Sequence, residues 1–174
     1  MFNKIRPLIF KFSPEVAHSL AIKALKLNNI SSIGIDTKTE KFDVCNKNGA
    51  EFSVSPMEND LNNKIAEYTH GNDLDVVIDF VSSKSSLELG ASILGKGGRL
   101  VTLGGSGEQF LANSADMLVK ELELIGSRYC TKQELKESLD LYARGLIKPL
   151  ISHKTDFNGA EELHNKIETG DITG

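Results

Sequence analysis

The chain has 174 residues, of which 40% are hydrophobic and 25% charged, so it has the size and composition of one ordinary globular domain. Two cysteines are too few for a disulfide framework or a multi-cysteine zinc site, and no apolar run is long enough to span a bilayer. The net charge of −4 argues against a nucleic-acid partner. The charge is uneven, because residues 1–30 hold five basic residues against one acidic residue, whereas the remainder carries a net charge of −8.

Residues 1–30 are predicted to form an amphipathic leader. The apolar spacing over residues 5–12 is helical, and Ser13-Pro14-Glu15 is typical of the start of a helix, which we expect over residues 16–27. Residues 8–12 can also be read as a strand, so the leader is either a pair of helices or a strand followed by a helix. The strand would fill a central sheet position whose backbone groups would otherwise stay unpaired.

From residue 31 onward, short apolar strands alternate with helices. Strands are expected at residues 32–36, 51–54, 75–81, 99–103 and 122–125, and helices at 39–48, 58–69, 85–94, 111–120, 132–144 and 160–168. A turn is expected at Gly95-Lys96-Gly97-Gly98 and an extended edge segment at residues 150–157. Repeated β–α units predict an α/β fold with a doubly wound, Rossmann-like parallel sheet over residues 31–174.

Ligands of such a sheet lie at the carboxyl ends of its strands, where three features stand out. Asp36, with Lys41 nearby, can accept hydrogen bonds from the ribose hydroxyls of a dinucleotide, or it can simply cap the next helix. Leu103-Gly104-Gly105 either lets a planar ring approach the backbone or forms a tight turn. Asp79 either faces a cofactor cleft or accepts backbone N–H bonds.

The glycine-rich loop that holds a dinucleotide pyrophosphate is not evident. If residues 8–12 are the first strand, the three glycine positions fall on Phe12, Pro14 and Ala17. Phe12 disfavours the positive φ of a tight turn, and Pro14 has no N–H to donate. We therefore expect weak pyrophosphate binding.

Four motifs follow one another in residues 31–174: Ile33-Gly34-Ile35-Asp36, Asp75-Val76-Val77-Ile78-Asp79-Phe80-Val81, Gly97-Gly98-Arg99-Leu100-Val101-Thr102-Leu103-Gly104 and Glu123-Leu124-Ile125-Gly126-Ser127. They resemble the cofactor-binding part of the medium-chain, zinc-type alcohol dehydrogenases, and weaker similarity reaches back to residue 17. The resemblance implies NAD as the cofactor and disfavours NADP. It also implies which residues contact the cofactor: Asp36 and Lys41 at the adenosine ribose, Thr37 and Val81 at the adenine, Leu103 and Gly104 near the nicotinamide, and Ser127, Arg128 and Tyr129 along it.

The departures from this family pattern shape the expected function. Ser82 stands where the family usually has Gly, and neither Cys45 nor Cys130 matches a zinc ligand, so we expect no zinc in this chain. The family's zinc-holding catalytic domain has no counterpart in these residues. The resemblance therefore implies a truncated NAD(P)-binding domain of an alcohol dehydrogenase-like oxidoreductase, inactive on its own. A non-enzymatic nucleotide-binding or membrane-surface module is the alternative.

The dense motif over residues 1–20 resembles the start of quinone-dependent dihydroorotate dehydrogenases, which lies on a membrane. It implies a weak contact of residues 1–27 with an anionic membrane surface. The flavin barrel of that family does not follow, so a fragment related to it is a second alternative. We expect a cytoplasmic chain that binds a dinucleotide, with peripheral contact at the inner face of the membrane and homo-oligomers as open options.

Overall fold

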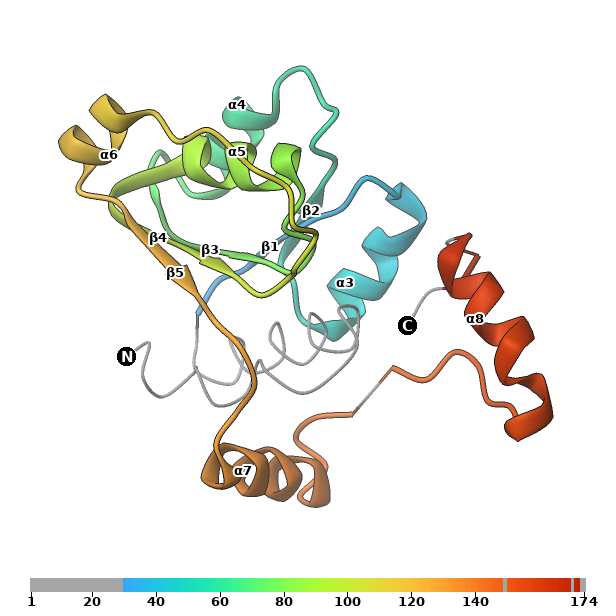
Figure 1. Cartoon of the computed structure of the whole chain (residues 1–174). Coiled ribbons are helices and arrows are strands. Elements are labelled where there is room, and N and C mark those ends of the chain that lie inside the picture. The colour runs from blue at the N-terminus through green and yellow to red at the C-terminus, as the bar shows by residue number, and fades with distance from the viewer. Residues whose placement is uncertain (1–29, 149, 170, 173–174) are drawn as a thin grey trace. The chain divides into compact units, whose positions relative to one another are not determined.

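The computed structural model describes residues 30–148, 150–169 and 171–172 of the chain (Figure 1). They belong to two compact units, one made of the residues up to Ser53 and from Cys130 onward, the other of Val54–Tyr129. Residues 1–29 lie outside the described residues, so both readings of the leader, and the boundary at residue 30, stay predictions.

The first unit is built around a short two-stranded sheet of β1 and β2. Its elements are β1 (Ile33–Ile35), the 3-10 helix η2 (Thr39–Lys41), α3 (Phe42–Asn48), β2 (Phe52–Val54, which ends at the first residue of the second unit), α7 (Lys132–Ala143), the 3-10 helix η3 (Phe157–Gly159) and α8 (Ala160–Glu168). α3 packs on β1 at Gly34, where an added Cβ would lie 3.2 Å from Cys45 Cβ and 3.1 Å from Ser53 Oγ. Glycine at this position therefore lets helix and sheet approach closely.

Local sequence signals explain where these helices begin and end. α3 ends at Gly49, as predicted, because this glycine adopts φ +116° and its N–H bonds back to the helix. α7 begins after Thr131, whose Oγ1 accepts from Glu134 N at 3.2 Å while Glu134 Oε2 accepts from Thr131 N at 2.6 Å. α8 spans the residues predicted for it.

The second unit is a three-stranded parallel sheet with helices, which confirms the predicted α/β fold (Figure 1). Its elements are α4 (Leu61–Tyr68), β3 (Leu74–Asp79), α5 (Lys84–Ile93), β4 (Leu94–Thr102), α6 (Ser114–Lys120) and β5 (Glu123–Gly126), with the strand order β3-β4-β5. Leu87, Leu94 and Leu100 form a buried cluster where α5 packs on the sheet. At Gly90 an added Cβ would lie 2.9 Å from Leu100 Cδ1, so α5 approaches the sheet closely.

The predicted turn at residues 95–98 lies inside β4. The register jumps from Leu74 opposite Leu94 to Val76 opposite Arg99, and Gly97 adopts φ +70° within the irregular stretch. Turn chemistry and strand pairing therefore coexist in the same residues, which a pattern of glycines alone does not reveal.

Three other boundaries differ from the prediction. The helix expected from residue 111 begins only at Ser114, because Asn113 Oδ1 accepts from Ala115 N at 2.9 Å and caps it. The helix expected from residue 58 begins at Leu61. The extended edge segment is wrong as a strand, since residues 150–156 form no ladder.

Among the described residues, no ladder joins the sheet of β1 and β2 to that of β3, β4 and β5. Residues 8–12, one reading of which is a central strand, lie outside the described residues, so that reading stays a prediction. Within that same part, none of the helices combines the length and the apolar character needed to cross a membrane.

Ser32, immediately before β1, offers a stability test. Its side chain is 9% exposed, and among the described residues its Oγ is the buried side-chain oxygen without a hydrogen-bond partner. Leaving such a group unsatisfied costs roughly 1–3 kcal/mol. We expect Ser32→Ala to raise the free energy of unfolding by about 1 kcal/mol in urea denaturation. Ser53→Ala is the control, because Ser53 Oγ donates to Asn46 Oδ1 at 2.8 Å, and it should not stabilise. A loss of stability in Ser32→Ala would contradict the assignment.

Candidate functional site

The carboxyl ends of β3, β4 and β5 lie side by side at one edge of the sheet in the second unit (Figure 1). Backbone hydrogen bonds continue past the strand ends, since Leu103 N donates to Asp79 O at 2.9 Å and Ser127 N donates to Thr102 O at 3.0 Å. Six of the predicted site residues follow these ends: Val81, Leu103, Gly104, Ser127, Arg128 and Tyr129. The structure therefore brings these six to the same edge, which we call the carboxyl edge.

Asp79, the last residue of β3, holds the backbone that follows this strand at the carboxyl edge. Its side chain is 7% exposed, and its Oδ1 accepts from Val81 N at 2.8 Å and from Ser82 N at 2.9 Å. Its Oδ2 accepts from Ser86 Oγ at 2.7 Å. Of the two readings of Asp79, the structure shows the acceptor of backbone N–H groups.

Ser82 holds an unusual backbone conformation next to Asp79. Its φ is +56°, in the left-handed region that favours glycine, and its side chain is buried. Two interactions hold it there: the bond to Asp79 and a hydrogen bond between Ser82 Oγ and Thr102 Oγ1. The Ser82 hydroxyl thus ties the end of β3 to the end of β4.

Gly104 lies where the backbones after β3 and β4 come together. An added Cβ would be 2.5 Å from Val81 O, 2.7 Å from Val81 C and 2.8 Å from Ser82 Oγ. No side chain fits there without moving the backbone, whereas an added Cβ at Gly105 meets nothing within 4 Å. The side chain of Val81 is 66% exposed and presents apolar surface at this edge.

Two exposed side chains follow β5, the cation of Arg128 and the aromatic ring of Tyr129. Arg128 places its guanidinium carbon 4.4 Å from the centroid of the Tyr129 ring, and its Nη2 donates to the Tyr129 hydroxyl at 2.6 Å. Tyr129 adopts φ +56°. The arrangement offers an ordered, charged and planar surface next to the carboxyl edge.

The remaining predicted residues, Asp36, Thr37 and Lys41, lie in the first unit, just after β1. Asp36 Oδ1 accepts from Lys38 N at 2.8 Å, which closes a turn, and neither η2 nor α3 has a side-chain cap. The helix-capping reading of Asp36 is therefore wrong. An ionised carboxylate has room for further donors, so Asp36 can still accept hydrogen bonds from a ligand.

The charge of Asp36 also acts on its own unit. Burial raises the pKa of the Cys45 thiol in α3, and the Asp36 carboxylate raises this pKa further. Cys45 is buried and therefore stays a protonated thiol at neutral pH. Within the described residues, no group of three or more His, Cys, Asp or Glu side chains converges.

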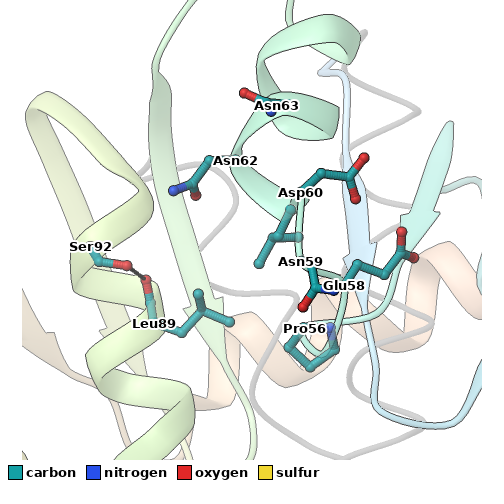
Figure 2. Close-up of a pocket in the computed structure, with 9 residues that line it drawn as sticks. Pro56, Glu58, Asn59, Asp60, Asn62, Asn63, Leu89 and Ser92 are labelled. Atoms are coloured by element: carbon teal, nitrogen blue, oxygen red, sulfur yellow. Dashed lines mark hydrogen bonds between the residues drawn. The ribbon is translucent and has the colours of Figure 1, made fainter.

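An open hollow of about 410 Å³ lies elsewhere in the second unit (Figure 2). α5 contributes Leu89 and Ser92, and the segment leading into α4 supplies mostly acidic and amide side chains. Lys64 hydrogen-bonds to Glu58 there and lowers the pKa of that carboxyl. None of the nine predicted site residues lines this hollow.

Two residues at the carboxyl edge carry no signal in the sequence. Ser106 Oγ donates to the carbonyl oxygen of Ser82, and Glu108 Oε2 accepts from Lys84 N at 2.6 Å. Each pair is 24 positions apart and depends on the path of an irregular loop, so spacing cannot predict it.

A family model described as zinc-binding dehydrogenase matches residues 19–144. An NAD-dependent alcohol dehydrogenase from Sulfurisphaera tokodaii is 24% identical over 157 residues, which are 90% of this chain and 45% of that protein. The alcohol dehydrogenase from Aeropyrum pernix shares the fold with a TM-score of 0.84 and 22% identity, over 99% of this chain and 51% of its own. A short chain alcohol dehydrogenase from E. coli, complexed with NADH, gives a TM-score of 0.78 and 24% identity, over 89% of this chain and 46% of its own.

The chain therefore spans about half the length of the relatives it matches. The three named here give no support to the dihydroorotate dehydrogenase resemblance of residues 1–27. That resemblance falls outside the described residues.

Proposed function

Because this chain belongs to the zinc-binding dehydrogenase family, we propose that it binds NAD at the carboxyl ends of its strands. The observation that supports the proposal is the carboxyl edge, where Gly104 leaves room for the backbone beside Val81 and six predicted residues follow the ends of three neighbouring strands. Crevices at such strand ends are where open parallel sheets bind their ligands. The Rossmann-like fold shared with dehydrogenase structures is consistent with this use.

In this proposal each part of the cofactor has its own contacts. The Asp36 carboxylate accepts hydrogen bonds from the adenosine ribose, with Lys41 beside it, while Thr37 and Val81 wall the adenine. Leu103 and Gly104 lie along the nicotinamide, together with Ser127, Arg128 and Tyr129. Bound NAD would supply a hydride-accepting ring, and these residues would hold and orient it.

The negative charge of Asp36 sets the preference for NAD over NADP, because it repels a 2′-phosphate. We expect Asp36→Ala to raise the dissociation constant for NADH roughly tenfold, which corresponds to the loss of about one hydrogen bond to a charged group. The same change should weaken NADPH binding less, or improve it. Fluorescence titration of NADH and NADPH, with and without the substitution, measures both effects.

Two further variants separate charge from turn geometry. Asp36→Asn keeps an oxygen for Lys38 N but removes the charge, so it should improve NADPH binding relative to NADH. Asp43→Ala removes an exposed acidic residue of α3 and should leave both affinities unchanged. If the wild-type chain shows no saturable NADH binding at millimolar concentration, the proposed cofactor site is absent.

The finer expectations carry their own tests. We propose that the chain alone does not turn over alcohols, because the zinc that acts as the electrophile in the family belongs to a domain that the resemblance does not cover. A steady-state assay with NAD and a panel of alcohols tests this.

A membrane-surface contact would rest on residues 1–27. Co-sedimentation with anionic vesicles tests it, and no change on deleting residues 1–12 would remove it.

A further inference from the structure

The loop between β4 and α6, residues 103–113, is tied to the beginning of α5 at three places. Ser106 Oγ donates to Ser82 O, Glu108 Oε2 accepts from Lys84 N at 2.6 Å, and Glu88 Oε1 accepts from Leu111 N at 3.1 Å. The loop itself contains neither helix nor strand. Its path depends on these side-chain bonds, on the backbone bond of Leu103 N to Asp79 O, and on Phe110, which packs against the cluster of Leu87, Leu94 and Leu100.

Glu108 makes the most specific of the three contacts. Lys84 is the first residue of α5, and its N–H belongs to the group that a helix leaves unpaired at its N-terminus. Ser83 and Ser86 already form a capping box at this helix start, so Glu108 satisfies an additional donor. A carboxylate is also favoured there by the helix dipole.

We propose that Glu108 is a positioning residue that fastens this loop to α5 and thereby holds the carboxyl edge ready for the dinucleotide. The inference rests on the proposed function of that edge. Gly104, whose contact with Val81 shapes the edge, lies four positions before Glu108 in the same loop. A loop released from α5 would let Leu103 and Gly104 move away from Val81.

Ser106 connects the fastening point to the edge itself. Its Oγ accepts from Glu108 N at 3.2 Å and donates to the carbonyl oxygen of Ser82. Ser82 is in turn held by Asp79 and Thr102 at the ends of β3 and β4. The hydrogen bonds thus run without a break from the start of α5 through Glu108 and Ser106 to the strand ends.

Hydrogen exchange without cofactor tests the fastening alone. In Glu108→Ala, the amides of Lys84, Leu103, Glu108 and Leu111, which donate hydrogen bonds in the closed loop, should exchange about tenfold faster than in the wild type, because that closed state loses a charge-assisted bond. Gln109→Ala, which changes the next, exposed residue of the loop, should exchange like the wild type. Equal exchange in the two variants would overturn the proposal.

NADH titration then tests positioning. Glu108→Ala should raise the dissociation constant about three- to tenfold, since part of the binding energy must first close the loop. Glu108→Gln keeps an acceptor oxygen and should recover part of the loss. Ser106→Ala combined with Glu108→Ala should cost less than the sum of the two single changes.

The outcomes separate this inference from the proposed function. If the wild type binds no NADH, the proposed function fails, and the exchange experiment still decides whether Glu108 fastens the loop. Faster exchange with unchanged NADH affinity would show a structural contact only and would overturn the positioning role.

Discussion

Asp79→Ala should lower the free energy of unfolding by about 3–5 kcal/mol, one of the two largest effects expected in this chain. The substitution leaves Val81 N, Ser82 N and Ser86 Oγ without the acceptor they share. Hydrogen bonds to a charged group are worth roughly 1.5–3 kcal/mol each, and three bonds to one buried group are not additive. Urea denaturation followed by circular dichroism measures the difference.

Asp79→Asn is the matched control for this prediction. Its amide oxygen can still accept from both backbone N–H groups, while the amide nitrogen meets Ser86 Oγ, a hydroxyl that can accept as well as donate. We expect about half the loss seen for Asp79→Ala. A stability of Asp79→Ala within about 1 kcal/mol of wild type would show that this carboxylate does not hold the strand end.

Gly104→Ala should disrupt the carboxyl edge itself. The new methyl group would have to lie 2.5 Å from the carbonyl oxygen of Val81. Because that oxygen is a backbone atom and the methyl group is attached directly to the backbone of residue 104, the loop must move. Overpacking of this kind costs roughly 1–3 kcal/mol in stability. NADH affinity should fall at least tenfold by titration, since the displaced segment is the one proposed to lie along the nicotinamide.

Gly105→Ala provides the comparison one residue later. An added Cβ at Gly105 meets nothing within 4 Å, so this variant should keep the stability and the NADH affinity of the wild type. If Gly104→Ala and Gly105→Ala had equal stability and equal NADH affinity, the contact between Gly104 and Val81 would not shape the site.

Strands and helices with strong local signals were predictable from the sequence. The near-continuous apolar run of β3 and the helix stop at Gly49 mark their elements clearly, because a β-branched run favours a strand and a positive φ favours glycine. The run also predicted burial on both faces, which is wrong for β3, since Asp75 and Val76 are exposed. The same pattern places Val81, Leu103 and Gly104 at neighbouring strand ends. Those predictions depend on local chemistry and on the general rule that parallel strands end at a common edge.

What escaped prediction depends on contacts between distant residues. The irregular path of β4 through residues 95–98 lies between two pairings with β3, that of Leu94 with Leu74 and that of Arg99 with Val76, so the turn tendency of three glycines does not end the strand. The role of Asp79 follows from where the chain turns after β3, and that of Glu108 from a loop that meets the start of α5. Such roles belong to the assembled edge and leave no period or spacing in the sequence.

The most direct test of cofactor binding is an amide NMR titration of the uniformly 15N-labelled chain with NADH. Binding at the carboxyl edge predicts the largest shifts at Val81, Ser82, residues 103–105 and residues 127–129. The amides of residues 59–63, beside the open hollow, should stay unchanged. Shifts confined to that hollow, or none up to millimolar NADH, would contradict cofactor binding at the carboxyl edge.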